Sequence, residues 1–308
     1  MNKIEIEHFQ ENGFLIVDNP AESKFIDNAK NSFKKILLKA KKENYRYVRV
    51  YDDYINKLNL AGIESVFHPE IIDQNIVELL NRSKIISYAK NILGENIKLT
   101  LSRYHITENI SHVGIWHRDA LVNQPLNTLQ INYYLFDERG MQIIPKSHLN
   151  ELREKENSKI NKYPYSKLKE AQFVETKQTQ ILIFNPALLH RGISANKRAN
   201  LHFRFEKKDN IINTKSACEL DYEKKKFYYK NIKFSDEWKE IVFSDKSIIF
   251  SKNLKKYHHP QKLKNKLLRI FRYTIYNVMF FFPINFLLYK KFNVRPNLKL
   301  RKYFKISY

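Results

Sequence analysis

The sequence predicts an α+β fold in which N-terminal helices brace a β-sandwich or jelly roll. Two observations support this prediction. Helical periodicity dominates up to Gly94, and short alternating strands separated by Pro, Asn, Asp and Gly turns follow it. A run of helices followed by a run of strands is typical of α+β domains. The chain has 308 residues, 43% of them hydrophobic, which suffices for one large domain with an extension.

The helices come first along the chain. The segment Phe9–Val17 predicts the end of a helix, a stop at Gly13 and a short apolar strand. Apolar residues then recur at helical spacing over Phe25–Ala40 and predict a long amphipathic helix with lysines on its outer face. A second helix is predicted over Gln74–Leu93, and Gly94 ends it.

Six further strands are predicted from the alternating pattern. Their ranges are Ile97–Ile106, Thr128–Phe136, Met141–Pro145, Gln172–Glu175, Thr179–Asn185 and Arg198–Phe205. In the second of these strands, Gln130 and Asn132 lie on the face opposite to the apolar residues. This polar face contacts solvent or lines a pocket inside a barrel. For the second case we count Gln130 and Asn132, together with Tyr104 of the first strand, as candidate cofactor-binding residues.

Composition excludes several classes of protein. Only six glycines are present and no Gly-rich phosphate-binding pattern occurs, which argues against propellers and nucleotide-binding loops. A single cysteine, Cys218, cannot form an intramolecular disulfide or a cysteine-based zinc site. The first residues show no apolar signal segment, so we expect a cytoplasmic protein.

The motif Trp116-His117-Arg118-Asp119 carries the clearest chemical signal. At the end of a strand, His117 and Asp119 project to the same side and can bind one cation, while Arg118 points away. His190 comes much later in the chain, after an apolar strand and a turn. Two histidines and one carboxylate are the facial triad of non-haem Fe(II) oxygenases, which leaves three positions for co-substrate and O₂. The alternative interpretation makes His190 a core histidine beside a turn.

Two arginines follow the distal histidine. Arg198 opens its strand shortly after His190, and its planar guanidinium can bind a carboxylate through two hydrogen bonds. It can therefore hold the far end of a dicarboxylate whose 2-oxo acid end chelates iron. Arg204 has the same parity in the strand and is the second candidate. The alternative for both is an arginine on the surface of an edge strand.

In their order along residues 5–206, these motifs resemble the phytanoyl-CoA dioxygenase-like family of Fe(II)/2-oxoglutarate-dependent oxygenases. The resemblance rests on the segments Phe9…Gly13-Phe14-Leu15-Ile16-Val17, Leu93-Gly94, Trp116-His117-Arg118-Asp119, Gly140-Met141-Gln142-Ile143-Ile144-Pro145-Lys146-Ser147-His148, Ile181-Leu182-Ile183-Phe184, His190-Arg191-Gly192 and Asn196. It implies a double-stranded β-helix in which His117, Asp119 and His190 hold Fe(II) and Arg198 binds the C5 carboxylate of 2-oxoglutarate. Ser147 and His148 are read as structural or pocket-rim residues.

The resemblance also implies the reaction. O₂ and 2-oxoglutarate are consumed, and succinate and CO₂ are released while a substrate is oxidised. Because Asp119 is present, hydroxylation is expected rather than halogenation, which needs the carboxylate ligand to be missing. The chain departs from the family pattern in having Lys146 in place of the usual glycine of Pro-Gly-Ser-His, Thr179-Gln180 in place of Gly-Asp, and Gly192 where a hydroxyl residue is common.

Residues 1–206 are therefore predicted to form the oxygenase domain, and residues 207–308 a basic, aromatic-rich, mainly helical extension. From Lys246 to Tyr308 there are 16 Lys or Arg and no Asp or Glu, so most of the net charge of +23 lies there. The apolar stretch Tyr273–Tyr289 contains Pro283, and it is too short and too interrupted for a spanning helix.

Three interpretations of the extension stay open. In the first, it packs against the domain or across a dimer. In the second, its residues 262–291 contact an anionic inner membrane face. In the third, its basic side chains contact nucleic acid, although no recognition motif for nucleic acid is present. The expected function is hydroxylation of a small organic or glycan- or lipid-linked substrate. The alternative is a non-catalytic protein that binds a membrane or a polyanion on the same scaffold.

Overall fold

The computed structural model describes residues 1–19, 21–42, 48–53, 58–63, 65–69, 71–108, 112–113, 115–151, 158, 160, 167–194, 198–210, 222–247 and 267. Its helices are α1 (Lys3–Asn12), α2 (Ser23–Lys42), α3 (Gln74–Asn81), α4 (Ile85–Leu93), α6 (Tyr222–Tyr229) and α7 (Asp236–Val242). Its strands are β1 (Phe14–Asp18), β2 (Val48–Asp53), β3 (Leu58–Ile63), β4 (Ile97–Glu108), β5 (His112–Val113), β6 (Thr128–Tyr134), β7 (Glu138–Ile143), β8 (Gln172–Thr176), β9 (Gln180–Phe184), β10 (His190–Ser194) and β11 (Arg198–Lys207).

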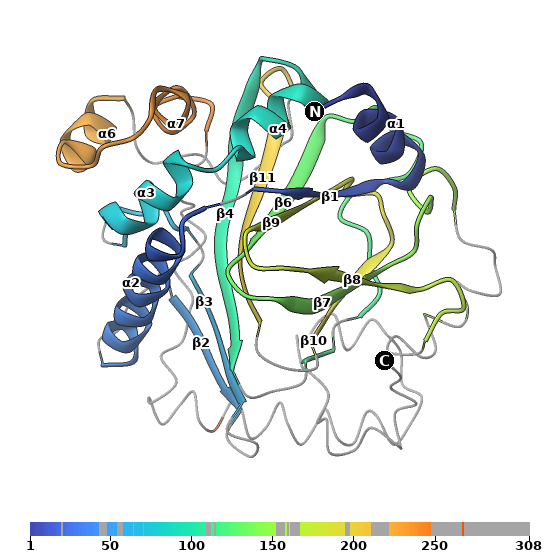
Figure 1. The fold of residues 1–308 in the computed structure, drawn as a ribbon, viewed down its shortest axis with the longest axis horizontal. Coiled ribbons are helices and arrows are strands. Elements are labelled where there is room, and N and C mark those ends of the chain that lie inside the picture. Colours follow the sequence, from blue (N-terminus) through green and yellow to red (C-terminus); the bar gives the residue numbers. More distant parts are fainter. Residues whose placement is uncertain are drawn as a thin grey trace.

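Within these residues the strands form two sheets (Figure 1). One has the order β1-β9-β6-β11-β4-β3-β2, and the other has the order β5-β10-β7-β8. The paired strands run antiparallel. Helices and antiparallel strands in one domain confirm the predicted α+β class. Strands β2, β3, β5 and β10 were not among the predicted elements, and β2 and β3 lengthen the larger sheet at its β4 edge.

The first helix ends at the glycine that the sequence predicts, and a capping box marks its start. Asn2 and Glu5 form a capping box at the start of α1, because each side chain accepts a hydrogen bond from the other residue's backbone N–H. Gly13 ends the helix at φ +80°, a conformation that suits glycine. A Cβ at Gly13 would lie 2.4 Å from the ring of His148, so glycine also allows the loop of His148 to approach.

The predicted helix over residues 74–93 is wrong in one respect, because it is two helices. Helix α3 ends at Asn81, and Ser83 donates its hydroxyl to the carbonyl of Leu80 at 2.6 Å. The backbone N–H of Lys84, at the start of α4, donates to the Asn19 side chain at 2.7 Å. Asn19, which lies far earlier in the chain, thus caps the start of α4 where the predicted helix is interrupted. Helical periodicity alone does not reveal such a cap.

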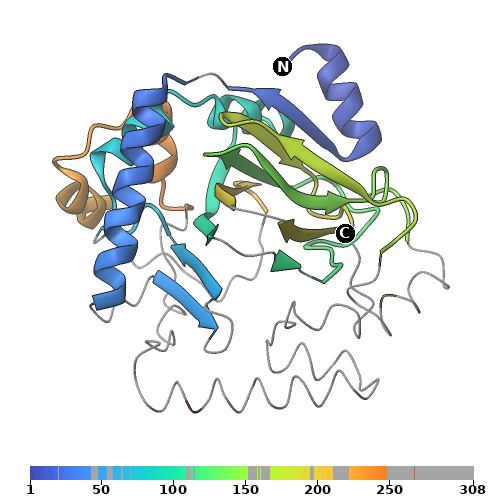
Figure 2. The ribbon, with the colours of Figure 1, turned by 60° about the horizontal axis from the view of Figure 1, so that its bottom comes forward.

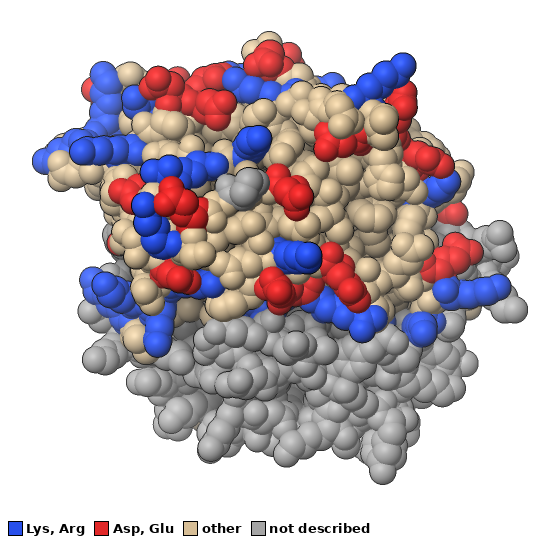
Figure 3. Space-filling model, viewed as in Figure 1, with Lys and Arg blue, Asp and Glu red and all other residues tan. Residues whose placement is uncertain are grey.

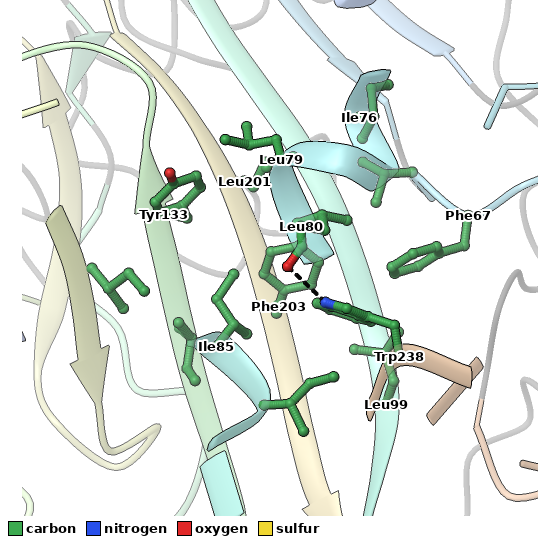
Figure 4. Close-up of a cluster of buried hydrophobic side chains, with 14 of the residues drawn as sticks. Phe67, Ile76, Leu79, Leu80, Ile85, Leu99, Tyr133, Leu201, Phe203 and Trp238 are labelled. Carbon is green, nitrogen blue, oxygen red and sulfur yellow. Dashed lines mark hydrogen bonds between the residues drawn. The ribbon is translucent and has the colours of Figure 1, made fainter. Parts of the chain in front are cut away.

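Helices α2, α3, α4, α6 and α7 cover one face of the larger sheet, whereas α1 lies apart from them (Figure 1, Figure 2). On β11, Ala199, Leu201, Phe203 and Phe205 face these helices and belong to the main hydrophobic core. Figure 4 shows Trp238 of α7 in this core, where its Nε1 donates to the Leu80 carbonyl at 2.8 Å. Burying large aromatic side chains against the sheet supplies much of the favourable free energy of folding.

Residues 222–247 of the predicted extension contribute to this same core. Its buried members are Tyr229, Phe234, Trp238, Ile241 and Val242. The backbone N–H of Leu99 in β4 donates to the Ser247 hydroxyl at 3.0 Å. Residues 222–247 therefore pack on the predicted oxygenase domain, and the hydrophobic core continues past the predicted boundary at residue 206. That boundary was placed where the motifs of the resemblance end, whereas the core continues with apolar residues after it.

The other face of the larger sheet is turned toward the smaller sheet. Seven buried apolar residues form a second cluster there: Tyr134, Met141, Ile143, Val174, Leu182, Phe184 and Leu188. Gln130 and Asn132 are buried on the same face of β6 as Tyr134. The polar face of this strand therefore lies inside the protein, which excludes the solvent interpretation of its alternation.

Two residues that are not glycine adopt left-handed backbone conformations at positions where the family usually has glycine. Lys146 has φ +63° and Thr179 has φ +74°. The N–H of Lys146 donates to the Asn12 carbonyl, and the N–H of Thr179 donates to the Tyr134 carbonyl. These hydrogen bonds to residues distant in the sequence hold each residue in a conformation that a side chain with a Cβ disfavours.

No helix in the described ranges is long and apolar enough to cross a membrane. Lysine, arginine and acidic side chains are interspersed over the described face in Figure 3. The predicted interfacial stretch Tyr273–Tyr289 and the rest of the basic segment 262–291 lie outside the described residues.

Candidate metal centre

His117, Asp119 and His190 are brought together at one end of the space between the sheets. His117 and His190 form an isolated β-bridge, in which each backbone N–H donates to the other carbonyl at 3.0 Å. The His117 Nε2 lies 3.8 Å from Asp119 Oδ1. One potential ligand atom from each of the three residues lies within 4.8 Å of the others. The backbone pairing thus fixes side by side two histidines that are far apart in the sequence.

Both imidazole rings are oriented in the same way. The His117 Nδ1 lies 3.0 Å from the Ile115 carbonyl, and the His190 Nδ1 lies 2.8 Å from the Leu188 carbonyl. Because a carbonyl only accepts hydrogen bonds, each Nδ1 carries the proton. Each Nε2 then keeps its lone pair for a metal ion. This is the arrangement in which metal-binding histidines are held by their other ring nitrogen.

The two oxygens of Asp119 have different surroundings. Oδ1 faces His117, while Oδ2 accepts hydrogen bonds from Gln130 Nε2 and, at 3.2 Å, from an Arg204 Nη. Burial raises the pKa of the Asp119 carboxyl, but the two neighbouring histidines, Gln130 and Arg204 lower it more, so the pKa lies below its usual value. The carboxylate is therefore ionised at neutral pH and suited to bind a cation.

The charge state of His190 also suits a metal ligand. Its ring is buried, and this burial together with the nearby His117 lowers its pKa to about 4. The ring is therefore neutral at pH 7. Two imidazole nitrogens and one carboxylate oxygen are the donors of the iron triad that the sequence predicts. The residues present therefore fit a divalent iron ion.

The loop of Ser147 and His148 supports the strand end before His190. Ser147 accepts from the Leu189 N–H at 2.8 Å and donates to the Ile144 carbonyl at 2.6 Å. His148 Nε2 lies 3.0 Å from the Gln10 carbonyl. Arg118, which the sequence predicts to point away from the metal, donates to the carbonyls of Ser147 and Ala187. These contacts give Ser147 and His148 a structural role and add Arg118 as a positioning residue.

The two predicted cofactor-binding arginines point into the same inter-sheet space but have different partners. Arg204 contacts Asp119, whereas the Arg198 Nε lies 2.8 Å from Glu138 Oε1. The Arg198 and Glu138 side chains are 14% and 1% exposed, which excludes the surface interpretation of Arg198. The extended strand between the two arginines separates their Cα atoms by about 20 Å. Arg204 is thus at the metal end and Arg198 at the far end.

The remaining predicted cofactor-binding residues are placed differently from one another. Gln130 reaches Asp119, and Asn132 lies on the same face of β6 opposite His202 of β11. Tyr104 instead stacks on Phe33 of α2, with ring centroids 3.9 Å apart, in the core beneath the helices. The structure therefore separates Tyr104 from the candidate centre, and we remove it from the site.

His202 is an inner-face residue that the sequence reasoning missed. Its ring lies 6.3 Å from that of Phe184, which in turn lies 5.3 Å from the His190 ring. Burial, with nearby His105 and basic residues, lowers the pKa of His202 well below its usual value. Residue 202 has the same parity along the strand as Arg198 and Arg204, so the strand alternation could have placed it on the inner face.

The family described as "Phytanoyl-CoA dioxygenase (PhyH)" matches residues 9–197, which is more than half of the chain. The chain belongs to this family. The family resemblance drawn from the motifs is therefore confirmed, and the match contains the three candidate metal ligands of this phytanoyl-CoA dioxygenase family member. No curated protein sequence matches that of the chain.

Several solved structures resemble this family member in fold. AviO1 from Streptomyces viridochromogenes Tue57 is 17% identical, with a TM-score of 0.53 over 66% of this chain and 93% of its own. EctD from S. alaskensis, in its apoform, is 14% identical, with a TM-score of 0.51 over 68% and 78% of the two chains.

SnoN, a non-haem α-ketoglutarate-dependent epimerase from nogalamycin biosynthesis, is 13% identical, with a TM-score of 0.50 over 67% of this chain and 82% of its own. Identities this low show a shared fold and leave the reaction of the chain to be argued from its own residues.

Proposed function

We propose that the chain is an Fe(II)- and 2-oxoglutarate-dependent dioxygenase that hydroxylates a small organic or glycan- or lipid-linked substrate and releases succinate and CO₂. The observation that carries this proposal is the approach of His117, Asp119 and His190, with both Nε2 atoms available and the carboxylate ionised. Family membership supports it. A structure of SnoN, similar in fold, contains Fe³⁺ and α-ketoglutarate.

Each residue of the centre has a proposed task. His117 and His190 bind iron through Nε2, and Asp119 binds it through Oδ1. Gln130 and Arg204 hold Oδ2 and fix the plane of that carboxylate. The iron ion supplies the activation of O₂, which protein side chains cannot perform. The buried apolar residues around Phe184 exclude water from this end of the inter-sheet space.

We assign the distal carboxylate of 2-oxoglutarate to Arg198. It is the arginine on the inner face of β11 that lies away from the metal ligands, and its guanidinium already binds a carboxylate, that of Glu138. The buried side chains of Gln130 and Asn132 provide polar groups between the metal end and the Arg198 end of the site. We further infer that the two sheets close as a double-stranded β-helix, which the sheet orders and the oxygenase structures similar in fold support.

Hydroxylation is proposed from the presence of Asp119, because family members that halogenate lack this carboxylate. The similar structures include an epimerase, so the outcome of oxidation depends on the substrate and its position. Contact of residues 262–291 with a membrane and formation of homo-oligomers stay predictions, as do the helices expected after residue 247. Contact with nucleic acid has only the charge of that segment in its favour.

Succinate formation from 2-oxoglutarate under O₂ with added Fe(II) tests the proposal without knowledge of the substrate. We expect His117→Ala to abolish turnover and Arg198→Ala to raise the 2-oxoglutarate concentration that is required. His8→Ala, a change on the exposed face of α1, is the matched control and leaves both unchanged. Anaerobic Fe(II) binding provides a second readout. A wild-type chain that binds neither Fe(II) nor 2-oxoglutarate would favour the non-catalytic scaffold.

A further inference from the structure

Glu138 is a buried carboxylate that the proposed reaction does not use. It begins β7, its side chain is 1% exposed, and its Oε1 lies 2.8 Å from Arg198 Nε. The Asn200 carboxamide lies 3.5 Å from the same oxygen. Among the described residues, no hydrogen-bond partner reaches Glu138 Oε2. A buried carboxylate with one unpartnered oxygen is costly, so its retention needs an explanation.

The chain provides space for this carboxylate through Gly140. The pairing of β7 with β8 shifts between Arg139 and Met141, so Gly140 is the extra residue of a bulge. A Cβ at Gly140 would lie 1.7 Å from Glu138 Oε1. The bulge also changes the parity of the strand, and Glu138 consequently faces inward like Met141. Glycine at residue 140 therefore allows Glu138 to reach Arg198.

The negatively charged Glu138 side chain lies against Arg198, whose positive charge the distal carboxylate of 2-oxoglutarate would need. Arg198 is the residue assigned to the distal carboxylate of 2-oxoglutarate, yet Glu138 occupies its Nε. We propose that Glu138 is an internal substitute for that carboxylate, which must release Arg198 before 2-oxoglutarate binds. The proposal rests on the proposed function and adds a residue that sets cofactor affinity.

Electrostatics makes this exchange sensitive to pH. Two carboxylates beside one guanidinium repel each other in a buried site, so binding favours the protonated form of Glu138. Burial raises the pKa of Glu138 to about 7, although Arg198, Asn200 and the Ala199 N–H lower it. The other facing groups are Tyr134 of β6, whose own pKa is raised by burial, and Thr176 of β8, whose hydroxyl donates to the Glu138 carbonyl.

The sign of the effect follows from proton uptake. Below about pH 7 Glu138 is largely protonated and gives up Arg198 readily. Above that pH, each further unit requires a proton to be taken up from a tenfold lower concentration, so the affinity for 2-oxoglutarate falls by up to about tenfold per pH unit.

Calorimetric titration of 2-oxoglutarate into the Mn(II)-loaded full chain without O₂ tests the proposal. At about pH 8, we expect Glu138→Gln to bind 2-oxoglutarate roughly tenfold more tightly than the wild type and to lose the pH dependence. Glu175→Gln is the matched control, because it removes a glutamate paired with Arg139 on the exposed face of the same β7–β8 pair. It should leave the affinity unchanged.

A second ligand separates this proposal from the proposed function. 2-Oxopentanoate has the same carbon chain as 2-oxoglutarate but lacks the distal carboxylate, so Glu138→Gln should not change its affinity. If wild-type protein binds both acids and Glu138→Gln changes neither affinity, the substitute role is wrong and the proposed function stands. If the metal-loaded wild type binds neither acid, the proposed function itself is wrong.

Gly140→Ala provides an independent variant that keeps both charges. The new Cβ would displace the Glu138 carboxyl from its present position, so we expect tighter 2-oxoglutarate binding in the same direction as for Glu138→Gln. Folding of each variant is checked by its thermal transition. Unchanged or weaker 2-oxoglutarate binding by a folded Gly140→Ala protein would contradict the proposal.

Discussion

Gln130 donates its side-chain amide to Asp119, and the same carboxylate faces His117 through its other oxygen. Gln130 comes from β6 in the larger sheet, whereas Asp119 lies in the loop that follows the β-bridge of His117. The N–H of Asp119 also donates to the Pro186 carbonyl at 2.8 Å, so its backbone and side chain are both held. The position of one candidate metal ligand thus depends on contacts from both sides of the site.

Replacing Gln130 with leucine tests this dependence without changing charge. The variant keeps the size of the side chain but removes the donor to Asp119, and loss of such a partner typically weakens metal binding by about tenfold or more. We expect this decrease in anaerobic Fe(II) titrations. Asn132→Leu, on the same inner face but without a contact to Asp119, is the control. Equal losses in the two variants would show that burial of any polar residue on this face matters, and not the contact with Asp119.

The candidate metal ligands could be predicted from sequence because two of them lie in one short motif and the third follows a strongly apolar strand. The partner of Arg198 could not, since Glu138 is distant from it in the sequence and faces inward only because of the bulge at Gly140. Tyr104 was misassigned for a related reason. The pairing of β11 with β4 shifts near Leu101, so alternation counted from the start of β4 gives the wrong face for Tyr104.

Thr179→Gly should stabilise the protein. Thr179 has φ +74°, and this left-handed conformation costs roughly 1–2 kcal/mol for a residue with a Cβ. Glycine relieves this strain but increases the entropy of the unfolded chain, so we expect a net gain of about 1 kcal/mol in the free energy of unfolding. Chemical denaturation measures it. Thr128→Gly in the extended strand β6 should instead destabilise. A loss of stability in both variants would contradict the strain argument.

We expect the buried His68 to make the folded protein less stable in acid. Burial lowers the pKa of His68 to about 4, whereas an unfolded histidine has a pKa of about 6.5. Between these values the unfolded chain binds the proton and the folded chain does not, so stability falls as pH decreases from about 6.5 to about 4. The full shift corresponds to about 3 kcal/mol. His68→Gln should show a shallower decline in denaturation midpoints over this range, and exposed His8→Gln should follow the wild type.

Substitutions of Trp238 test whether residues after 206 are part of the folded domain. It is buried against Phe67 and Phe203, with ring centroids 5.2 and 5.8 Å away, and its Nε1 donates to the Leu80 carbonyl. Trp238→Ala would leave a large cavity and should lower the free energy of unfolding by about 3–5 kcal/mol. Trp238→Phe keeps most of the apolar contact and loses the hydrogen bond, so about 1 kcal/mol is expected.

The control for Trp238→Ala is Phe227→Ala in α6, because the Phe227 side chain is 67% exposed and its removal should change stability by less than about 0.5 kcal/mol. Removal of every residue after 206 should be more damaging than any of these substitutions, since it exposes Phe67, Leu80 and Phe203 at once. Denaturation curves of the four proteins check the order. A fragment 1–206 that unfolds at the wild-type midpoint would show that the sequence boundary was right and that the packing of α7 contributes nothing to the stability of the domain.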